Sequence, residues 1–532
     1  MMRGSHAWEW WGLIGIGLVT ACLKFLYQPD LRSSIDGSFY LNVASHVANG
    51  DGLKTTVSLY RQGFQELPHA SLVYPLWPLL LGAGARLLGL FRSARVIPEL
   101  LFAVNLVAVF LFARTVARRV VPAGVPSIPW YRSPGAIALS ATLLLASNHV
   151  FFRYSSKPYT EPLALALTLG ALLALFRFSA RGRTKWAVLA GVLAAAAYLT
   201  RSQCVGTVVG VLGALAIAGA RDPNARRAFA AASAASLATV LPWLVYVARS
   251  ARVIDPRLLL NFAVHRETPE LPPFHIFVAT DGWLGYVVDR ASGVLVAFDP
   301  TTTMSYVFSW GPVAYSVVIV SAILVWKWRG LRELFGTSLT TSGVPMTAVV
   351  GTGVACLLPV HMLHSQYVYE WWFGHRYGLF LLLLIVPAFS YLVVAGARLR
   401  RVAALLLALS VVWGGSLIGA AVLYERPSPT PARLEFEAWL SNQEETVFLA
   451  THPQVLSVYT EAGFHWIDCK DPAFVTRAMV ELLPIDFVVS LPRDRQCPFL
   501  SDLGQYRPVA RFGSGETEIA VFALISGSTS GR

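Results

Sequence analysis

The fold is decided by residues 161–178, EPLALALTLGALLALFRF, in which no charged residue lies between Glu161 and Arg177. A helix needs roughly 20 predominantly apolar residues to cross the hydrocarbon core of a bilayer. Backbone N–H and C=O groups in hydrocarbon must be hydrogen-bonded within the protein, so a spanning segment is a helix or belongs to a closed barrel. Barrel strands alternate apolar and polar residues over about ten positions, and this unbroken run does not. It therefore predicts a transmembrane helix.

Similar apolar runs occur on both sides of this stretch. By the criterion of roughly 20 residues we expect an all-α polytopic membrane bundle with about 11–13 transmembrane helices. The run at 186–200 is short, and the run at 72–91 begins with Pro75 and Pro78, which suits a re-entrant or interfacial helix. The expected helices lie near residues 10–28, 72–91, 96–113, 135–152, 161–178, 186–200, 203–220, 228–248, 305–328, 345–363, 377–397 and 402–424.

The composition agrees with a membrane protein and argues against a nucleic-acid-binding one. The chain is 55% hydrophobic and 14% charged, whereas soluble domains are about 25% charged. The net charge of +13 comes mostly from Arg at the ends of apolar runs, where basic residues anchor helices and set their orientation. No basic tract with interleaved aromatic residues is present, as a nucleic-acid groove would need.

Basic loops predict the orientation of the bundle. Cytoplasmic loops are enriched in Lys and Arg, and the richest loops here are at 179–185, 221–227, 327–335 and 398–401. Strict alternation cannot place all of these and the cluster at 114–119 on one side if both 72–91 and 96–113 cross. The first apolar run has no small-residue cleavage site before Asp30, so we expect a retained signal-anchor helix. The loop 29–70 then lies opposite the cytoplasm.

Three segments are too polar to span a membrane, namely 29–70, 249–304 and 425–532. We expect a transmembrane domain at 1–424, in which 249–304 is an external or interfacial loop, and a small α/β soluble domain at 425–532. In the latter, strand patterns at 446–450, 487–490 and 518–524 alternate with helical patterns at 455–462 and 475–483. Cys469 and Cys497 could form a disulfide if this domain lies outside the cytoplasm.

Several short motifs occur in order along the chain and resemble those of one superfamily. The chain resembles the GT-C superfamily of glycosyltransferases over about residues 10–400, specifically the bacterial relatives of dolichyl-phosphate-mannose–protein mannosyltransferases and the aminoarabinose transferases. The motifs are DGSFYLNVASHVANGDG at 36–52, HASLVYPLWPLL at 69–80, FFRYSSKPYTEPL at 151–163, AGVLAAAAYLTRS at 190–202 and HRY at 375–377.

The resemblance implies transfer of a monosaccharide from a polyprenyl-phosphate donor to a protein, lipid or glycan acceptor, with inversion at the anomeric carbon. An external carboxylate would act as general base, and Asp36 is the candidate. The family often shows Asp followed by Glu, whereas Gly37 follows here, so the second carboxylate role would be unfilled or pass to Glu161. The implied location is a bacterial cytoplasmic (inner) membrane, with the active site on the extracytoplasmic side. A divalent metal is possible, but the sequence does not require one.

Guanidinium groups stabilise the negative charge of a departing phosphate with bidentate geometry. On that ground the candidates for binding the donor phosphate are Arg376 and Arg201, with Lys157 and Tyr377 as weaker ones. His69 is a candidate for the acceptor site or simply a loop histidine.

Each assignment has a structural alternative. Asp36 could be a solvated helix cap, Glu161 a helix N-terminal residue that interacts with the dipole, and the two arginines interfacial anchors. His361 and His364 have a spacing that is common by chance, and we read the aromatic cluster around them as an interfacial belt rather than a metal site.

The main alternative function is a transporter or flippase of lipid-linked sugars. Such proteins usually carry internal repeats and charged or Gly/Pro-broken spans at mid-bundle, whereas the spans here are nearly free of charge. A polysaccharide polymerase normally has its large external loop late in the chain. A non-catalytic subunit would be insensitive to a change at Asp36.

Overall fold

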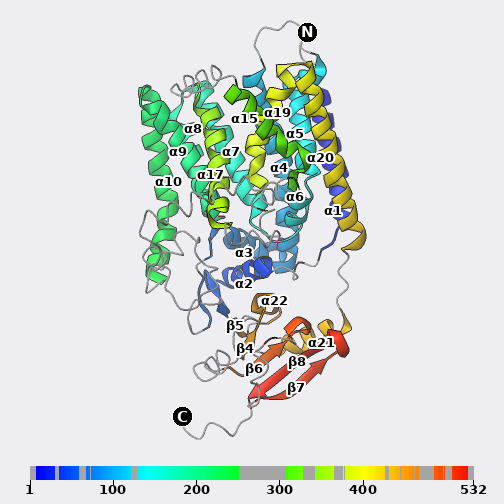
Figure 1. Cartoon of the computed structure of the whole chain (residues 1–532). Helices are drawn as coiled ribbons and strands as arrows, with labels where there is room; N and C mark the ends of the chain where they lie inside the picture. The colour runs from blue at the N-terminus through cyan, green and yellow to red at the C-terminus, as the bar shows by residue number, and fades with distance from the viewer. Residues whose placement is uncertain are drawn as a thin grey trace, which may run out of the picture.

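The computed structural model describes a helical bundle that stands on a small sheet domain (Figure 1). The described residues are 7–29, 31, 35–58, 67–71, 73–121, 129–250, 307, 309–326, 342–364, 376, 378–425, 430–443, 446–460, 462–466, 485–494, 497 and 506–524. The bundle and the sheet domain confirm the predicted fold class.

The expected apolar runs all contain a helix. Within the described residues, seven helices are long and apolar enough to cross a membrane, and five apolar helices are shorter. Among the described residues, the helices of the bundle are α1 (Ala7–Leu26), α2 (Ile35–Asn49), α3 (Leu76–Leu88), α4 (Leu90–Val120), α5 (Pro134–Ala146), α6 (His149–Tyr154), α7 (Glu161–Arg181), α8 (Thr184–Tyr198), α9 (Val205–Gly219), α10 (Pro223–Ser250), α15 (Tyr315–Trp326), α17 (Val344–His364), α19 (Leu382–Ala395) and α20 (Ala397–Tyr424). Helix α21 (Pro431–Leu440) belongs to the C-terminal domain.

The expected helix at 135–152 is divided into α5 and α6. Asn148 lies between them in an extended conformation, and its side chain accepts a hydrogen bond from the backbone N–H of Phe151 at 2.8 Å. Asparagine at an N-cap satisfies a backbone donor that a new helix leaves free. The chain therefore restarts as α6 and turns toward the end of the bundle that holds α2 and α3 (Figure 1).

Helix α3 is shorter than a typical transmembrane helix. It has 13 residues, which corresponds to about 20 Å against a hydrocarbon core of about 30 Å. It packs beside α2 at one end of the bundle (Figure 1), with Trp77 and Leu81 buried against Leu41 and Ala44. A Cβ at Gly82 would lie 2.5 Å from a Val47 methyl group, so glycine allows this close approach. These features match the interfacial alternative for 72–91.

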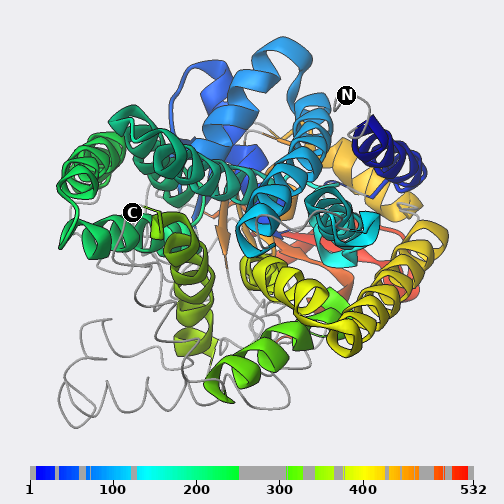
Figure 2. The ribbon, with the colours of Figure 1, turned by 90° about the horizontal axis from the view of Figure 1, so that it is seen from above.

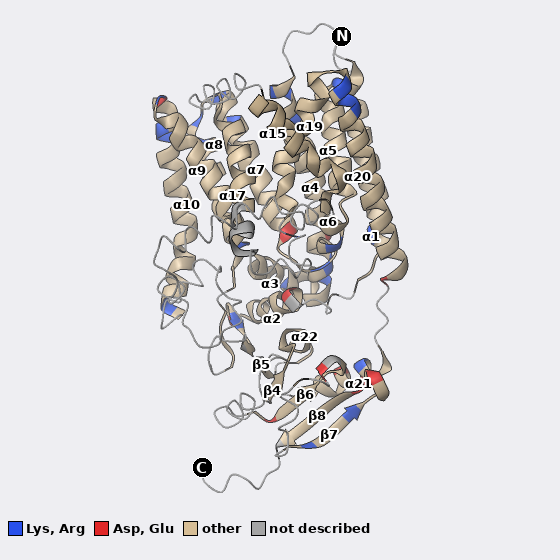
Figure 3. Ribbon diagram, in the orientation of Figure 1, with Lys and Arg blue, Asp and Glu red and all other residues tan. Residues whose placement is uncertain are grey.

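The opposite end of the bundle gathers the basic clusters, and we call it the basic end. Arg119, at the end of α4, donates hydrogen bonds to Ser179 Oγ of α7 at 3.1 Å and to the Ser342 carbonyl near the start of α17 at 3.2 Å. Asn224 of α10 donates to the Gly182 carbonyl at 3.4 Å. Lys and Arg are concentrated at this end in Figure 3. The cluster at 114–119 therefore shares an end with the clusters at 179–185 and 221–227.

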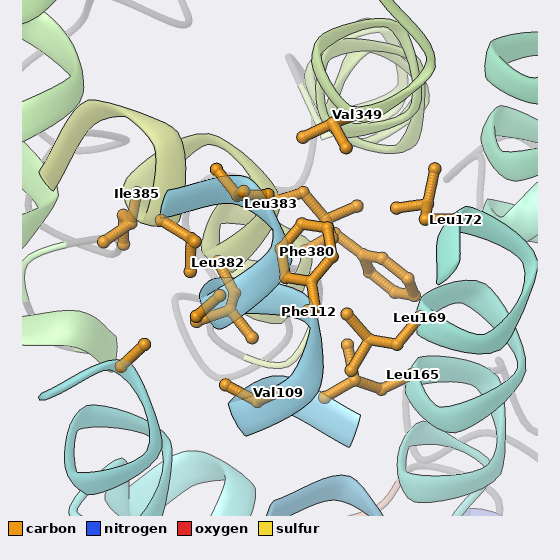
Figure 4. Packing of buried hydrophobic residues seen from close by; sticks show 14 of the residues in the cluster. Val109, Phe112, Leu165, Leu169, Leu172, Val349, Phe380, Leu382, Leu383 and Ile385 are labelled. Carbon is orange, nitrogen blue, oxygen red and sulfur yellow. The ribbon is translucent and has the colours of Figure 1, made fainter. Parts of the chain in front are cut away.

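The core of the bundle is built by helices from distant parts of the sequence. Viewed from above, early and late helices lie side by side (Figure 2). Side chains from α4, α7, α17 and α19 and the short helix at 378–381 meet in its centre (Figure 4); among the buried ones are Phe112, Leu169, Leu172, Val349, Phe380 and Leu383. Helices α9 and α17 approach closely because Gly206 and Gly210 face the backbone at Cys356 and Thr352. Small residues at such contacts are typical of membrane bundles.

The C-terminal domain is a six-stranded sheet of order β2-β5-β4-β6-β8-β7. Its strands are β2 (Val57–Ser58), β4 (Val447–Ala450), β5 (Gly463–Trp466), β6 (Phe487–Ser490), β7 (Tyr506–Phe512) and β8 (Ile519–Leu524). The strand patterns expected at 446–450, 487–490 and 518–524 correspond to β4, β6 and β8. The helix expected at 455–462 is wrong beyond Leu456: α22 spans Pro453–Leu456, and β5 follows because residues 463–466 pair with strands on both sides.

The segment between α2 and α3 completes this sheet. Strand β2 is parallel to β5, with Val57 opposite Phe464 and Ser58 opposite His465. Residues 54–55 (β1) and 69–70 (β3) form a separate antiparallel pair beside it. This segment and the C-terminal residues therefore build one unit, although some 400 positions separate them in the sequence.

The cysteines fall into two groups. Cys22, Cys204 and Cys356 are free, and Cys497 is disulfide-bonded. The expected partner, Cys469, lies outside the described residues, as does the helix expected at 475–483.

Candidate active site at one end of the bundle

Four charged side chains meet at the end of the bundle opposite the basic end, and we call them the four-charge cluster. Arg376 forms an ion pair with Asp36 of α2. Arg201 donates to Glu161 at 2.6 Å between Nη1 and Oε1. Arg376 also lies beside Glu161, at 3.9 Å between Nε and Oε1. The two carboxylates and two guanidinium groups thus form one continuous chain of alternating charge.

Burial differs sharply within this cluster. The side chains of Glu161, Arg201 and Arg376 are 1%, 10% and 11% exposed, whereas the side chain of Asp36 is 38% exposed. Buried charges are stable only when paired and hydrogen-bonded, which is the situation of Glu161 and Arg201. Asp36 is the carboxylate of the cluster that a molecule from outside can reach.

The position of Glu161 follows from its place at the start of α7. The preceding loop is fixed by the indole N–H of Trp77, which donates to the Pro158 carbonyl at 2.9 Å. Asn105 of α4 donates to the Pro162 carbonyl at 2.7 Å. Pro162 suits the first turn of a helix because its missing N–H has no intrahelical partner there. These contacts hold the buried carboxylate at the N-terminus of α7, where the helix dipole also favours negative charge.

Arg201 lies at a break between helix α8 and the short helix at 202–204. Its backbone is extended there. Its guanidinium donates to Thr160 Oγ1 at 3.1 Å and to Gln203 Oε1 at 3.3 Å, in addition to Glu161. Several acceptors arranged around one guanidinium fix its plane, which a lysine could not reproduce.

Two tyrosines adjoin the cluster, and neither was a candidate from its sequence motif. Burial, and next the charge of Asp36, raises the pKa of Tyr40 above its ordinary value. Tyr40 therefore stays a neutral phenol that can donate a hydrogen bond. Tyr154 interacts electrostatically with all four cluster residues. Its ring centroid lies 4.6 Å from that of Tyr159. The spacing i, i+4 from Asp36 places Tyr40 on the same helix face, and this signal could have found it.

The remaining predicted residues lie elsewhere or outside the described residues. Lys157 is in the turn between α6 and α7, in the loop that leads to Glu161. His69 is in β3, opposite Thr55, and its charge affects His465 of the C-terminal sheet. Tyr377 and the side chains of His361 and His364 are not among the described residues.

No group of three His, Cys, Asp or Glu side chains placed to hold a metal ion occurs among the described residues. The four-charge cluster offers two carboxylates, and both are paired with arginines.

Known structures share this architecture. The oligosaccharyltransferase of Archaeoglobus fulgidus in its apo form aligns with a TM-score of 0.56 at 12% identity, covering 92% of this chain and 70% of that one. Its complex with Zn and sulfate gives a TM-score of 0.57 at 11% identity, covering 96% and 73%. An arabinofuranosyltransferase from Mycobacteria gives 0.52 at 14% identity, covering 98% of this chain and 41% of that one.

The chain is an integral membrane protein with the fold of the GT-C superfamily of glycosyltransferases. Within that class, residues 132–246 match the family model described as dolichyl-phosphate-mannose-protein mannosyltransferase. The matched stretch contains Glu161 and Arg201. The resemblance read from the sequence motifs is confirmed at the level of the fold. A comparison with curated proteins found no match.

Proposed function

We propose that the protein transfers a monosaccharide from a polyprenyl-phosphate donor to an acceptor hydroxyl or amine, by inverting displacement. The observation that carries this proposal is the pairing of a reachable carboxylate, Asp36, with a guanidinium, Arg376, in one cluster at the end of a membrane bundle. A base for the acceptor and a cation for the leaving phosphate are the two groups that this reaction needs.

In the proposed reaction the acceptor oxygen or nitrogen attacks the anomeric carbon as the bond from that carbon to the phosphate oxygen breaks. The proton of the acceptor passes to Asp36. The phosphate keeps the electron pair of the broken bond, and its negative charge is stabilised by Arg376, with Arg201 behind it. Attack from the face opposite the phosphate inverts the configuration at the anomeric carbon.

We assign the site to the extracytoplasmic face. The basic end lies at the other end of the bundle (Figure 3), and clusters of Lys and Arg mark the cytoplasmic side of membrane proteins. The disulfide-bonded Cys497 is in the domain at the site end, and disulfides persist in oxidising compartments. Both observations support a site that faces away from the cytoplasm, as in a bacterial inner membrane.

The test is sugar transfer by the purified protein in liposomes, with a panel of polyprenyl-phosphate monosaccharides and candidate acceptors. Asp36→Asn keeps the size of the side chain but cannot accept the proton. We expect it to fold and insert and to lose transfer by roughly 100- to 10,000-fold, the usual contribution of a general base.

Asp51→Asn is the matched control, because Asp51 is an exposed carboxylate that follows the same helix and pairs with His46. It should transfer sugar at the wild-type rate. Turnover retained by Asp36→Asn would reject the mechanism. If the wild type moved lipid-linked sugar across the bilayer without transferring it, the flippase alternative would replace this proposal.

A further inference from the structure

We propose that Asn42 is a positioning residue that ties α2 to the C-terminal sheet and so sets the place of Asp36 against Arg376. This inference rests on the proposed function, because it concerns the carboxylate assigned there as the base. Asn42 lies on α2, six residues after Asp36, and is 2% exposed.

The amide of Asn42 is fully hydrogen-bonded. Its N–H₂ group donates to Thr56 Oγ1 at 2.8 Å and to the Ser457 carbonyl at 3.4 Å. Its carbonyl accepts from Thr55 Oγ1 at 2.8 Å and from the backbone N–H of Thr56 at 3.2 Å. An asparagine side chain has two donors and two acceptor lone pairs, so every site on this amide is used.

These bonds join three segments of the chain. Thr56 in turn accepts a hydrogen bond at its carbonyl from the backbone N–H of Phe464 in β5, at 2.8 Å. The neighbouring Val57 is fully buried in the core of the C-terminal domain, against which Phe39 of α2 also packs. We call Asn42, residues 55–57 and the facing part of the sheet the α2–sheet junction.

The junction restrains the rotation and depth of α2. On another face of the helix, Leu41 and Ala44 pack against α3. A helix held between a membrane bundle and a sheet can turn only if one contact breaks. Asp36 is in the first turn of this helix, and its side chain is more exposed than the other three charges. Its fixed position therefore depends on the helix more than on local burial.

The consequence can be measured without knowing the sugar or the acceptor. Asp36 forms an ion pair with Arg376, so its carboxylate competes with a phosphate for the same guanidinium and weakens the binding of the phosphate. Undecaprenyl phosphate is the probe. Asp36→Asn should tighten its binding by about 5-fold, the equivalent of roughly 1 kcal/mol for a partly exposed ion pair. Arg376→Gln should weaken binding.

Asn42→Ala should loosen α2, release Asp36 from Arg376 and tighten probe binding by about 2- to 5-fold. In the Asp36→Asn background the same change should have no further effect, because the carboxylate that it positions is gone. Such non-additivity is the signature of residues that act through one another. Asn49→Ala is the matched control, since Asn49 is an exposed asparagine at the end of the same helix.

A merely structural role for Asn42 would give a different result, in which the variant leaves binding unchanged, weakens it, or changes it equally in both backgrounds. Any of these overturns the inference. If Asn42→Ala does not fold, Thr55→Val removes one hydrogen bond to the amide, and the same cycle applies with a smaller shift in the same direction. Failure of the proposed function is distinguishable, because the probe would then bind wild type and Arg376→Gln alike.

Discussion

The charged residues of the candidate site differ in what their removal should cost. Glu161 is almost completely buried and lies between Arg201 and Arg376. Taking one partner from a buried ion pair leaves an uncompensated charge, which usually destabilises a protein by about 3–5 kcal/mol. Asp36, with its more exposed side chain, should be far less important for stability than for chemistry.

We therefore expect Glu161→Ala to lower stability by about 3 kcal/mol and Glu161→Gln by about 1–2 kcal/mol, since glutamine can still accept a hydrogen bond from Arg201. Thermal unfolding in detergent, followed by tryptophan fluorescence, measures the difference. Glu435→Gln is the control, because Glu435 is exposed on the C-terminal domain. Equal unfolding temperatures for all three variants would show that the pair does not support the fold.

At the scale of elements, the short helix α3 decides the topology. If it lies in the interface, the turn between α3 and α4 is on the same side of the membrane as Asp36. If it crossed, that turn would be on the side of the basic end. The difference can be read from single residues at the two ends.

In a Cys22→Ser background, we expect Arg92→Cys to react with a membrane-impermeant maleimide only from the extracytoplasmic side. Arg92 is exposed in the first turn of α4. Arg183→Cys, in the exposed turn between α7 and α8 at the basic end, should react only from the cytoplasm. Labelling of both positions from one side would refute the interfacial assignment.

The long helices could be predicted from the sequence, whereas the depth of α3 and the pairing of β2 could not. The long helices were predictable because a run of apolar residues is a local signal and the bilayer requires a helix. The depth of α3 was not, since apolarity alone does not distinguish a crossing helix from an interfacial one. Strand β2 was missed because two residues carry no periodicity. Asp36 and Arg376 were nominated from motifs, but their contact joins positions that are 340 residues apart. Asn42 gave no signal, because its partners include Ser457.

At the scale of the whole molecule, the stability of the sheet that joins residues 57–58 to the C-terminal domain should depend on pH. Burial, and next the charge of His69, lowers the pKa of His465 from 6.5 to about 4. A pKa that is lower in the folded state means that protonation favours unfolding. The contribution is fully present above about pH 6.5 and is lost progressively as the pH falls toward 4.

We expect the C-terminal domain to become sensitive to protease as the pH falls through this window. His465→Gln, which cannot titrate, should flatten the profile. His46→Gln should keep the wild-type profile, because His46 lies on α2 beside the exposed Asp51 and outside the sheet. Limited proteolysis from pH 4 to 8, with an acid-stable protease, measures the effect. An unchanged acid sensitivity in His465→Gln would assign it to other groups.

The parallel pairing of β2 with β5 has a consequence for biogenesis. During synthesis, residues 57–58 leave the ribosome long before their partners at 463–466 exist. Residues 57–58 therefore remain without their neighbouring strand until nearly the whole chain has been made. The contacts of α2 with the C-terminal domain form only then, so a nascent or prematurely terminated chain has its helices but lacks the support that the sheet gives to the helix of Asp36.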